Sequence, residues 1–206
     1  LNILEAGDEV IAGSGLFGGT IDLFGDLKAF GITTHFVESV TAEAVAPLLN
    51  EKTKVVFTEL IGNPKLDVVD LKKVSALVHE HGVPLIIDST TATPYLLHTF
   101  DFGADVIVHS SSKYINGGGN SISGVIIDSG NFRWDPERYH GFAEYKKIWQ
   151  VCLSGKIAER YLEKLRQLFS SDECIHEYVG LETLGLRMER ICSNAKQLAE
   201  YLESRG

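Results

Sequence analysis

Short apolar segments alternate with amphipathic ones along the first two thirds of the chain. Runs rich in β-branched and other apolar residues predict strands at 9–12, 32–37, 54–60, 83–88, 104–108 and 124–128. Apolar positions at helical spacing predict helices over 20–30, 41–49 and 70–81, with Gly31 and Gly82 as stops and Pro47 as an interruption. Apolar strands separated by helices are typical of a parallel or mixed sheet that is covered on both faces. The pattern therefore predicts an α/β fold.

The pattern changes after residue 145. A long helix is predicted over 147–169, a polar break at 170–172, and an amphipathic helix over 184–202, with no clear strand between the two helices. We expect residues 1–145 to form one large domain. Residues 146–206 are expected to form a linking helix and the start of a second domain.

Composition narrows the class of protein. The chain is 44% hydrophobic and 23% charged, and its formal net charge of −9 disfavours nucleic acid and anionic membrane surfaces as partners. The apolar runs are too short to cross a membrane, and the N-terminus lacks a signal-peptide pattern. The three cysteines are widely spaced, which fits reduced thiols in a cytoplasmic protein and no metal site. Both ends look cut, so we expect part of a longer protein.

Polar residues follow three of the predicted strands. Asn63 comes after the third, Asp88 ends the fourth, and a segment from Ser110 to Lys113 ends the fifth. Functional side chains gather where the carboxyl ends of parallel strands meet. A lysine at the end of a buried strand is expected to be desolvated, and burial makes its amine a usable nucleophile. These strand ends predict one site.

The residue types fit an aldehyde cofactor such as pyridoxal phosphate (PLP). Such a cofactor needs a lysine amine, a carboxylate facing its pyridine nitrogen, donors for its phosphate and a flat residue over its ring. Lys113, Asp88 and the serines at 110 and 112 supply the first three, and Phe17 is able to stack on a ring.

A second constellation competes with this site. Gly13, Gly15 and Gly18 match the pattern G-x-G-x-x-G between a strand and a helix, and Glu38 ends the next strand. That layout is typical of a dinucleotide-binding oxidoreductase, with the acid on a ribose hydroxyl. The short first strand and the bulky Leu16-Phe17 pair weaken this interpretation, and it stays open.

Several motifs resemble one enzyme family in order and with matching gaps. They are LFGGT (16–20), Asn63-Pro64, PLIIDSTTATPY (84–95) and GADVIVHSSSKY (103–114). These motifs resemble the Cys/Met metabolism family of PLP-dependent enzymes, which have fold type I. The segments VIIDSGNFRW (125–134) and GLETLGLRMER (180–190) are most similar to the O-acetylhomoserine sulfhydrylase branch. The resemblance covers nearly the whole chain except about 170–178.

The resemblance implies a three-layer α/β sandwich with a mostly parallel central sheet, the aspartate aminotransferase-like large domain, followed by the start of a C-terminal α+β domain. It implies that Lys113 holds the cofactor as a Schiff base and that Asp88 pairs with the pyridinium. Ser110 and Ser112 would contact the phosphate, Asn63 would lie near the ring hydroxyl, and Phe17 would stack on the ring. A homo-oligomer, dimer or tetramer, and an amino-acid substrate are implied as well.

The implied reaction is γ-replacement on an O-acyl-homoserine, with methionine γ-lyase or cystathionine γ-synthase activity as the alternative within the family. Several positions depart from the family pattern. Phe17 replaces a usual tyrosine and Ser112 a usual threonine, Ser89 and Thr91 replace Asn and Phe, and Gly118 stands where histidine is common. The family's phosphate-binding Ser-Gly turn and N-terminal arm would precede residue 1, and its carboxylate-binding arginine would follow residue 206. A truncated, inactive family member is therefore a third interpretation.

Overall fold

The computed structural model describes residues 2–143, 152–158 and 171–205, and its centre is one six-stranded sheet. The strand order is β2-β1-β3-β4-β5-β6; β1 to β5 run parallel, and β6 pairs antiparallel with β5. The sheet confirms the predicted mostly parallel α/β architecture. The strands are β1 (Glu9–Gly13), β2 (Thr33–Val37), β3 (Thr53–Glu59), β4 (Leu85–Asp88), β5 (Val106–His109) and β6 (Val125–Asp128).

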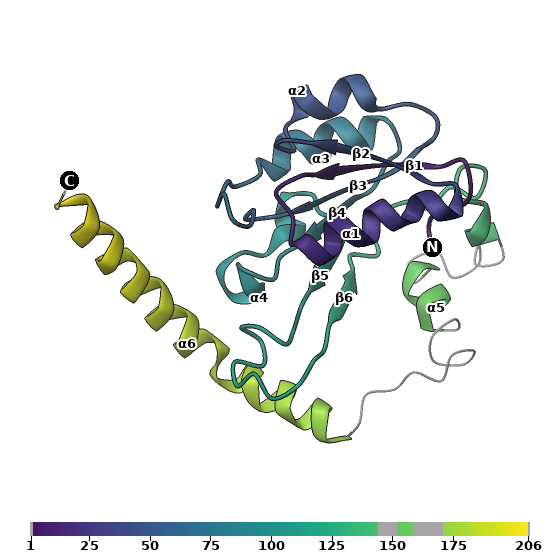
Figure 1. Ribbon diagram of the computed structural model, residues 1–206. Helices are drawn as coiled ribbons and strands as arrows, with labels where there is room; N and C mark the ends of the chain where they lie inside the picture. The colour runs from purple at the N-terminus through teal and green to yellow at the C-terminus, as the bar shows by residue number, and fades with distance from the viewer. Residues whose placement is uncertain (1, 144–151, 159–170, 206) are drawn as a thin grey trace.

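Helices cover both faces of the sheet, with α1 on one face and α2 and α3 on the other (Figure 1). Adjacent strand residues point to opposite faces, so Val10 and Ile11 of β1 belong to different hydrophobic cores. The core that contains Ile11 includes Val74 and Val78 of α3, all three with no exposed surface. This double burial explains why the central residues of β1, β4 and β5 are apolar on both faces.

The helices begin and end where local signals place them. Gly31 adopts φ 75° after the 3-10 turn that continues α1, and the side chains of Thr41 and Asp70 cap α2 and α3 by accepting backbone N–H groups. The short helix α4 and the 3-10 turn η3 were not predicted, because four residues are too few to show a helical period. The bounds are α1 (Gly18–Asp26), η1 (Leu27–Phe30), α2 (Ala42–Val45), η2 (Ala46–Leu48), α3 (Leu71–Glu80), α4 (Thr93–Leu96) and η3 (Thr99–Phe102).

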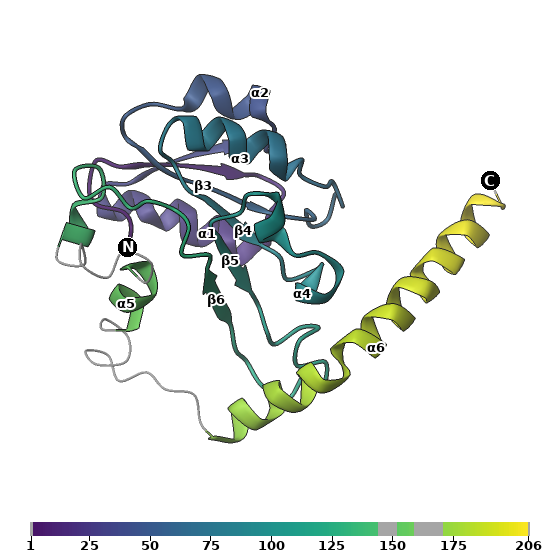
Figure 2. The same ribbon diagram turned by 180° about the vertical axis from the view of Figure 1, so that it is seen from behind.

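The C-terminal part contains α5 (Cys152–Ala158) and a long helix, α6 (Ser171–Glu203). The prediction that this last helix starts at Leu184 is wrong: the helix begins at Ser171. Residues 174–183 mix exposed apolar and polar side chains without a clear stripe, so the sequence pattern did not reveal this first part. Most of the predicted helix 147–169 and the domain boundary at 146 lie outside the described residues. Helix α6 lies against the segment that joins β5 to β6 and then extends away from the sheet (Figures 1 and 2).

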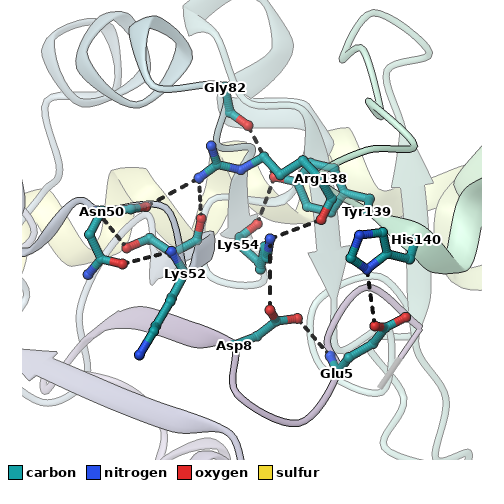
Figure 3. A network of polar contacts seen from close by, with 10 residues as sticks. Glu5, Asp8, Asn50, Lys52, Lys54, Gly82, Arg138, Tyr139 and His140 are labelled. Carbon is teal, nitrogen blue, oxygen red and sulfur yellow. Dashed lines mark hydrogen bonds and ion pairs between the residues drawn. The ribbon is translucent and has the colours of Figure 1, made fainter.

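A polar network fastens the segment after β6 to the amino ends of the strands (Figure 3). Arg138 donates to the carbonyl of Thr53 at 2.6 Å, and the buried hydroxyl of Tyr139 lies 3.1 Å from the carbonyls of Lys54 and Gly82. Lys54 in turn donates to the Arg138 carbonyl at 2.9 Å. This network lies at the end of the sheet opposite to the carboxyl ends of the parallel strands.

The structure also bears on membrane spans and on the cysteines. Among the helices that the structure describes, none is both long enough and apolar enough to cross a membrane. Cys174 and Cys192 are exposed free thiols, and the side chain of Cys152 lies outside the described set.

Candidate functional site

A cavity of about 960 Å³ opens at the carboxyl ends of β3, β4 and β5. The start of α1, the turn after β5 and the middle of α6 form its walls. All six residues predicted as a cofactor site line this cavity: Phe17, Asn63, Asp88, Ser110, Ser112 and Lys113. The parallel order of the strands brings them together, because each predicted residue follows the end of a strand or begins a helix at that edge.

Asp88 ends β4 and is held by Thr90. The Thr90 N–H and hydroxyl donate to Oδ1 of Asp88 at 2.9 and 2.5 Å, and the Thr90 hydroxyl oxygen accepts the Ser110 N–H at 2.8 Å. Within the described part of the chain both bonds fall on Oδ1, so Oδ2 is available to a cationic donor in the cavity.

The turn after β5 presents Lys113 to the cavity. The Lys113 N–H donates to the Ser110 carbonyl at 3.2 Å, which closes a tight turn directly after the strand. The hydroxyl of Ser112 accepts the Ser123 N–H at 2.8 Å and donates to the Ser123 carbonyl at 3.0 Å. The Ser112 hydroxyl is therefore already engaged, whereas Ser110 offers its hydroxyl and Lys113 its amine.

The expected burial of Lys113 is wrong. Its side chain is exposed, because it lies four positions beyond His109, the last residue of β5, and faces the open cavity.

Phe17 stands at the cavity mouth as the residue that precedes α1, with 60% of its surface exposed. Its backbone N–H donates to Oε1 of Glu59 at 2.6 Å. Asn63 follows β3, and its N–H donates to the Gly15 carbonyl at 3.1 Å. The two loops are thus joined by backbone contacts beside the cavity.

Helix α6 forms one wall of the cavity, with residues that were not predicted from the sequence to belong to a site. Arg187 donates to the carbonyls of Tyr114 and Ile115, at 2.7 and 3.2 Å, and so ties the helix to the turn that carries Lys113. Arg190 and Leu186 also line the cavity. Glu59 and Thr90 were missed as well, although Glu59 ends an apolar strand in an acid, the same signal that identified Asp88.

The glycine motif of the competing interpretation has no comparable space. Gly13, Gly15 and Glu38 line a second cavity of only about 10 Å³, room for about one water molecule. Glu38 is paired with Lys65 at 2.8 Å, and that salt bridge holds the pKa of Glu38 below its usual value. A dinucleotide does not fit this turn.

One known protein family matches the chain over its whole length. The sequence model of a family described as Cys/Met metabolism PLP-dependent enzyme matches residues 1–206. The chain belongs to this family. The family is PLP-dependent, which confirms the cofactor predicted from the sequence.

The relatives within the Cys/Met metabolism family include sulfhydrylases. The O-acetyl-L-homoserine sulfhydrylase of Leptospira meyeri is 39% identical over 98% of the chain and 50% of its own length. The structure of the Wolinella succinogenes O-acetylhomoserine sulfhydrylase matches with a TM-score of 0.88 and 40% identity, over 98% of this chain and 57% of that one.

An O-acetylhomoserine (thiol)-lyase structure from Campylobacter jejuni matches with a TM-score of 0.86 and 29% identity, over 98% of this chain and 52% of that one. It holds an N'-pyridoxyl-lysine-5'-monophosphate. The chain spans about half the length of the curated relatives it matches.

The residues of the cavity fit PLP. An amine, a carboxylate with one available oxygen, a hydroxyl at Ser110 and an aromatic ring at the mouth face one space, and its volume is in the range of small-molecule sites. The cavity is also lined by Arg190 of α6, whose guanidinium suits an anionic ligand.

Proposed function

We propose that this chain contributes the cofactor and substrate cavity of an enzyme that replaces the γ-substituent of an O-acyl-homoserine with sulfide or a thiol, giving homocysteine or methionine. The observation that carries the proposal is the convergence of Lys113, Asp88 and Phe17 on one cavity in a chain of the Cys/Met metabolism family. The similarity to O-acetylhomoserine sulfhydrylases supports the choice of reaction.

Each residue has a distinct role in this proposal. PLP, when bound, supplies an electron sink that stabilises negative charge on the substrate carbons. Lys113 holds the cofactor and moves protons at Cα and Cβ of the substrate, after which the ester group leaves Cγ and the sulfur adds there. Asp88 keeps the pyridine nitrogen protonated, and Phe17 covers the ring. Ser110 would bind the phosphate through its hydroxyl, and Ser112 would do so once its hydroxyl gives up the bond to the Ser123 carbonyl. Asn63 would lie by the ring hydroxyl.

The proposal extends to the substrate class, the cellular location, the assembly and the domains of the protein. We infer an amino-acid substrate, a cytoplasmic enzyme and a homo-oligomer, a dimer or tetramer. Residues 1–145 would be the PLP-binding large domain, and 146–206 the link to a C-terminal domain. The exposed apolar residues of α6, such as Leu186, Leu198 and Leu202, support assembly, because side chains of this kind are usually covered in the functional protein. Light scattering measures the assembly; a monomer at micromolar concentration contradicts it.

The main test replaces the lysine. In the purified protein incubated with PLP, Lys113→Ala is expected to abolish borohydride trapping of the cofactor. It should also lower homocysteine formation from O-acetylhomoserine and sulfide by about 10³-fold, in the range that loss of an acid–base group produces. The matched control is Lys52→Ala, which removes an exposed lysine outside the cavity and should leave both readouts unchanged.

The outcomes separate the alternatives. If Lys113→Ala keeps the trapped cofactor and the activity of the unaltered protein, the proposal is wrong. A keto acid formed without sulfide indicates γ-elimination, the methionine γ-lyase type of reaction. PLP uptake without turnover indicates an inactive family member, and Phe17→Tyr then tests whether the missing hydroxyl is the cause.

A further inference from the structure

Glu59 is a buried acid in the cavity to which the proposed function gives no role. It is the last residue of β3, it is 8% exposed, and it lines the cavity. In the parallel register β3 pairs with β4, and Glu59 stands directly beside Asp88. Paired residues of neighbouring strands project to the same face of a sheet, so the two carboxyl groups share one side.

The carboxyl of Glu59 is tied to Phe17. Its Oε1 accepts the Phe17 N–H at 2.6 Å, although the two residues are 42 positions apart in the chain. Helix α1 has no side-chain cap of its own at this end. The first N–H groups of a helix lack partners within the helix, so the bond from Glu59 fixes the point where α1 begins.

The ring of Phe17 is placed by the same turn. A Cβ atom at Gly19 would stand 3.0 Å from Cε1 of Phe17, tighter than ordinary contacts. The ring therefore lies over a glycine that leaves space for it. Two features therefore determine the position of the Phe17 ring. The hydrogen bond to Glu59 holds the Phe17 backbone, and the absence of a side chain at Gly19 leaves room for the ring.

The surroundings of the Glu59 carboxyl act on its pKa in opposite directions. Burial raises the pKa of the Glu59 carboxyl, and the charge of Asp88 raises it further, whereas the Phe17 N–H lowers it. Asp88 has two donors from Thr90. A buried acid that keeps such a position needs a compensating interaction, and the Phe17 N–H supplies it.

We propose that Glu59 is a positioning residue: its carboxyl anchors the Phe17 amide and thereby holds the Phe17 ring at the face of the cavity where the cofactor ring binds. The inference rests on the proposed function for the identity of that ring as PLP. The anchor itself is a property of the chain without the cofactor, so the two ideas are tested separately.

The experiment compares three variants with the unaltered protein. Glu59→Ala removes the acceptor, and Glu59→Gln keeps an acceptor oxygen without the charge. Glu38→Ala is the matched control, because Glu38 is an acid that follows the end of another parallel strand, the edge strand β2, and lies outside the main cavity. The readouts are hydrogen exchange at the Phe17 amide without PLP and the dissociation constant of PLP by absorbance titration.

We expect Glu59→Ala to speed exchange at the Phe17 amide about tenfold, as the loss of a hydrogen bond to a carboxylate implies. It should raise the PLP dissociation constant about tenfold as well. Glu59→Gln should stay within about threefold of the unaltered protein in both readouts, since it retains the acceptor. Glu38→Ala should change neither.

Three results overturn the inference. One is exchange in Glu59→Ala equal to that of the unaltered protein. Another is faster exchange with an unchanged PLP dissociation constant, and the third is a Glu59→Gln variant as impaired as Glu59→Ala. If the unaltered protein binds no PLP, the proposed function fails, and the exchange rates still decide whether Glu59 anchors Phe17.

Discussion

At the scale of single residues, Thr90 connects two parts of the cavity. Its hydroxyl donates to Asp88 at 2.5 Å and accepts the N–H of Ser110 at 2.8 Å. One side chain thus links the carboxylate proposed to face the cofactor nitrogen with the turn proposed to hold its phosphate. Neither link is visible in the sequence, because the two residues that Thr90 connects are 22 positions apart.

Replacing Thr90 tests this link. Thr90→Val keeps the shape of the side chain but removes the hydroxyl, so the Ser110 N–H loses its acceptor. We expect the PLP dissociation constant to rise about tenfold. Thr90→Ser keeps the hydroxyl and should stay within about threefold. Thr33→Val, the same replacement at an exposed position of β2 outside the cavity, serves as the control. Equal PLP binding in Thr90→Val and Thr90→Ser would show that the hydroxyl is not needed.

Residue types at strand ends were enough to locate the cavity. Asp88, Asn63 and Ser110 were predicted because an apolar strand ended in a polar side chain. Glu59 carries the same signal, but an acid at a strand end has many ordinary explanations. Its role depends on the register of β3 against β4 and on the distance to Phe17, which only the folded chain defines.

At the scale of elements, α6 packs closely on the segment that follows Lys113. A Cβ atom at Gly180 would collide with the backbone oxygens of Ile115 and Asn116. Arg187, about two turns further along the helix, donates hydrogen bonds to the carbonyls of Tyr114 and Ile115. The glycine permits the close approach, and the arginine fixes it.

Gly180→Ala is expected to push α6 away from this segment. Overpacking against backbone atoms costs about 1–3 kcal/mol, and the cavity wall that contains Arg187 should shift. Denaturant unfolding and PLP titration measure the two effects. Gly25→Ala is the control, because no atom lies within 4 Å of its Cβ position and a helical alanine should stabilise α1 by about 0.5–1 kcal/mol. If Gly180→Ala leaves the free energy of unfolding unchanged, α6 does not pack closely on this segment.

At the scale of the whole molecule, one end of the sheet forms the cavity and the other end contains a polar network that stabilises the fold. The carboxyl ends of the parallel strands carry the cavity, and the amino ends carry the network around Arg138 and Tyr139 (Figure 3). Tyr139 is 2% exposed, and burial raises its pKa well above the usual tyrosine value. Its hydroxyl therefore stays protonated and available as a donor at neutral pH.

Tyr139→Phe should separate stability from cofactor binding. Loss of the buried hydroxyl leaves a carbonyl of Lys54 or Gly82 without its donor, at a cost of about 1 kcal/mol in the free energy of unfolding. The midpoint temperature of thermal unfolding should fall by about 2–4 °C, while the PLP dissociation constant stays unchanged. Tyr201→Phe, on the exposed part of α6, is the control for the substitution itself. A large change in PLP binding would contradict the division of tasks.

The sequence by itself determined the alternation of strands and helices, the mostly parallel sheet and three cavity residues at strand ends, Asn63, Asp88 and Ser110. It did so because burial on both faces of a sheet leaves an apolar pattern that can be read locally. The start of α6 at Ser171, the exposure of Lys113 and the contact between Glu59 and Phe17 were decided by tertiary structure. Each depends on how distant segments approach one another, and no local pattern records that approach.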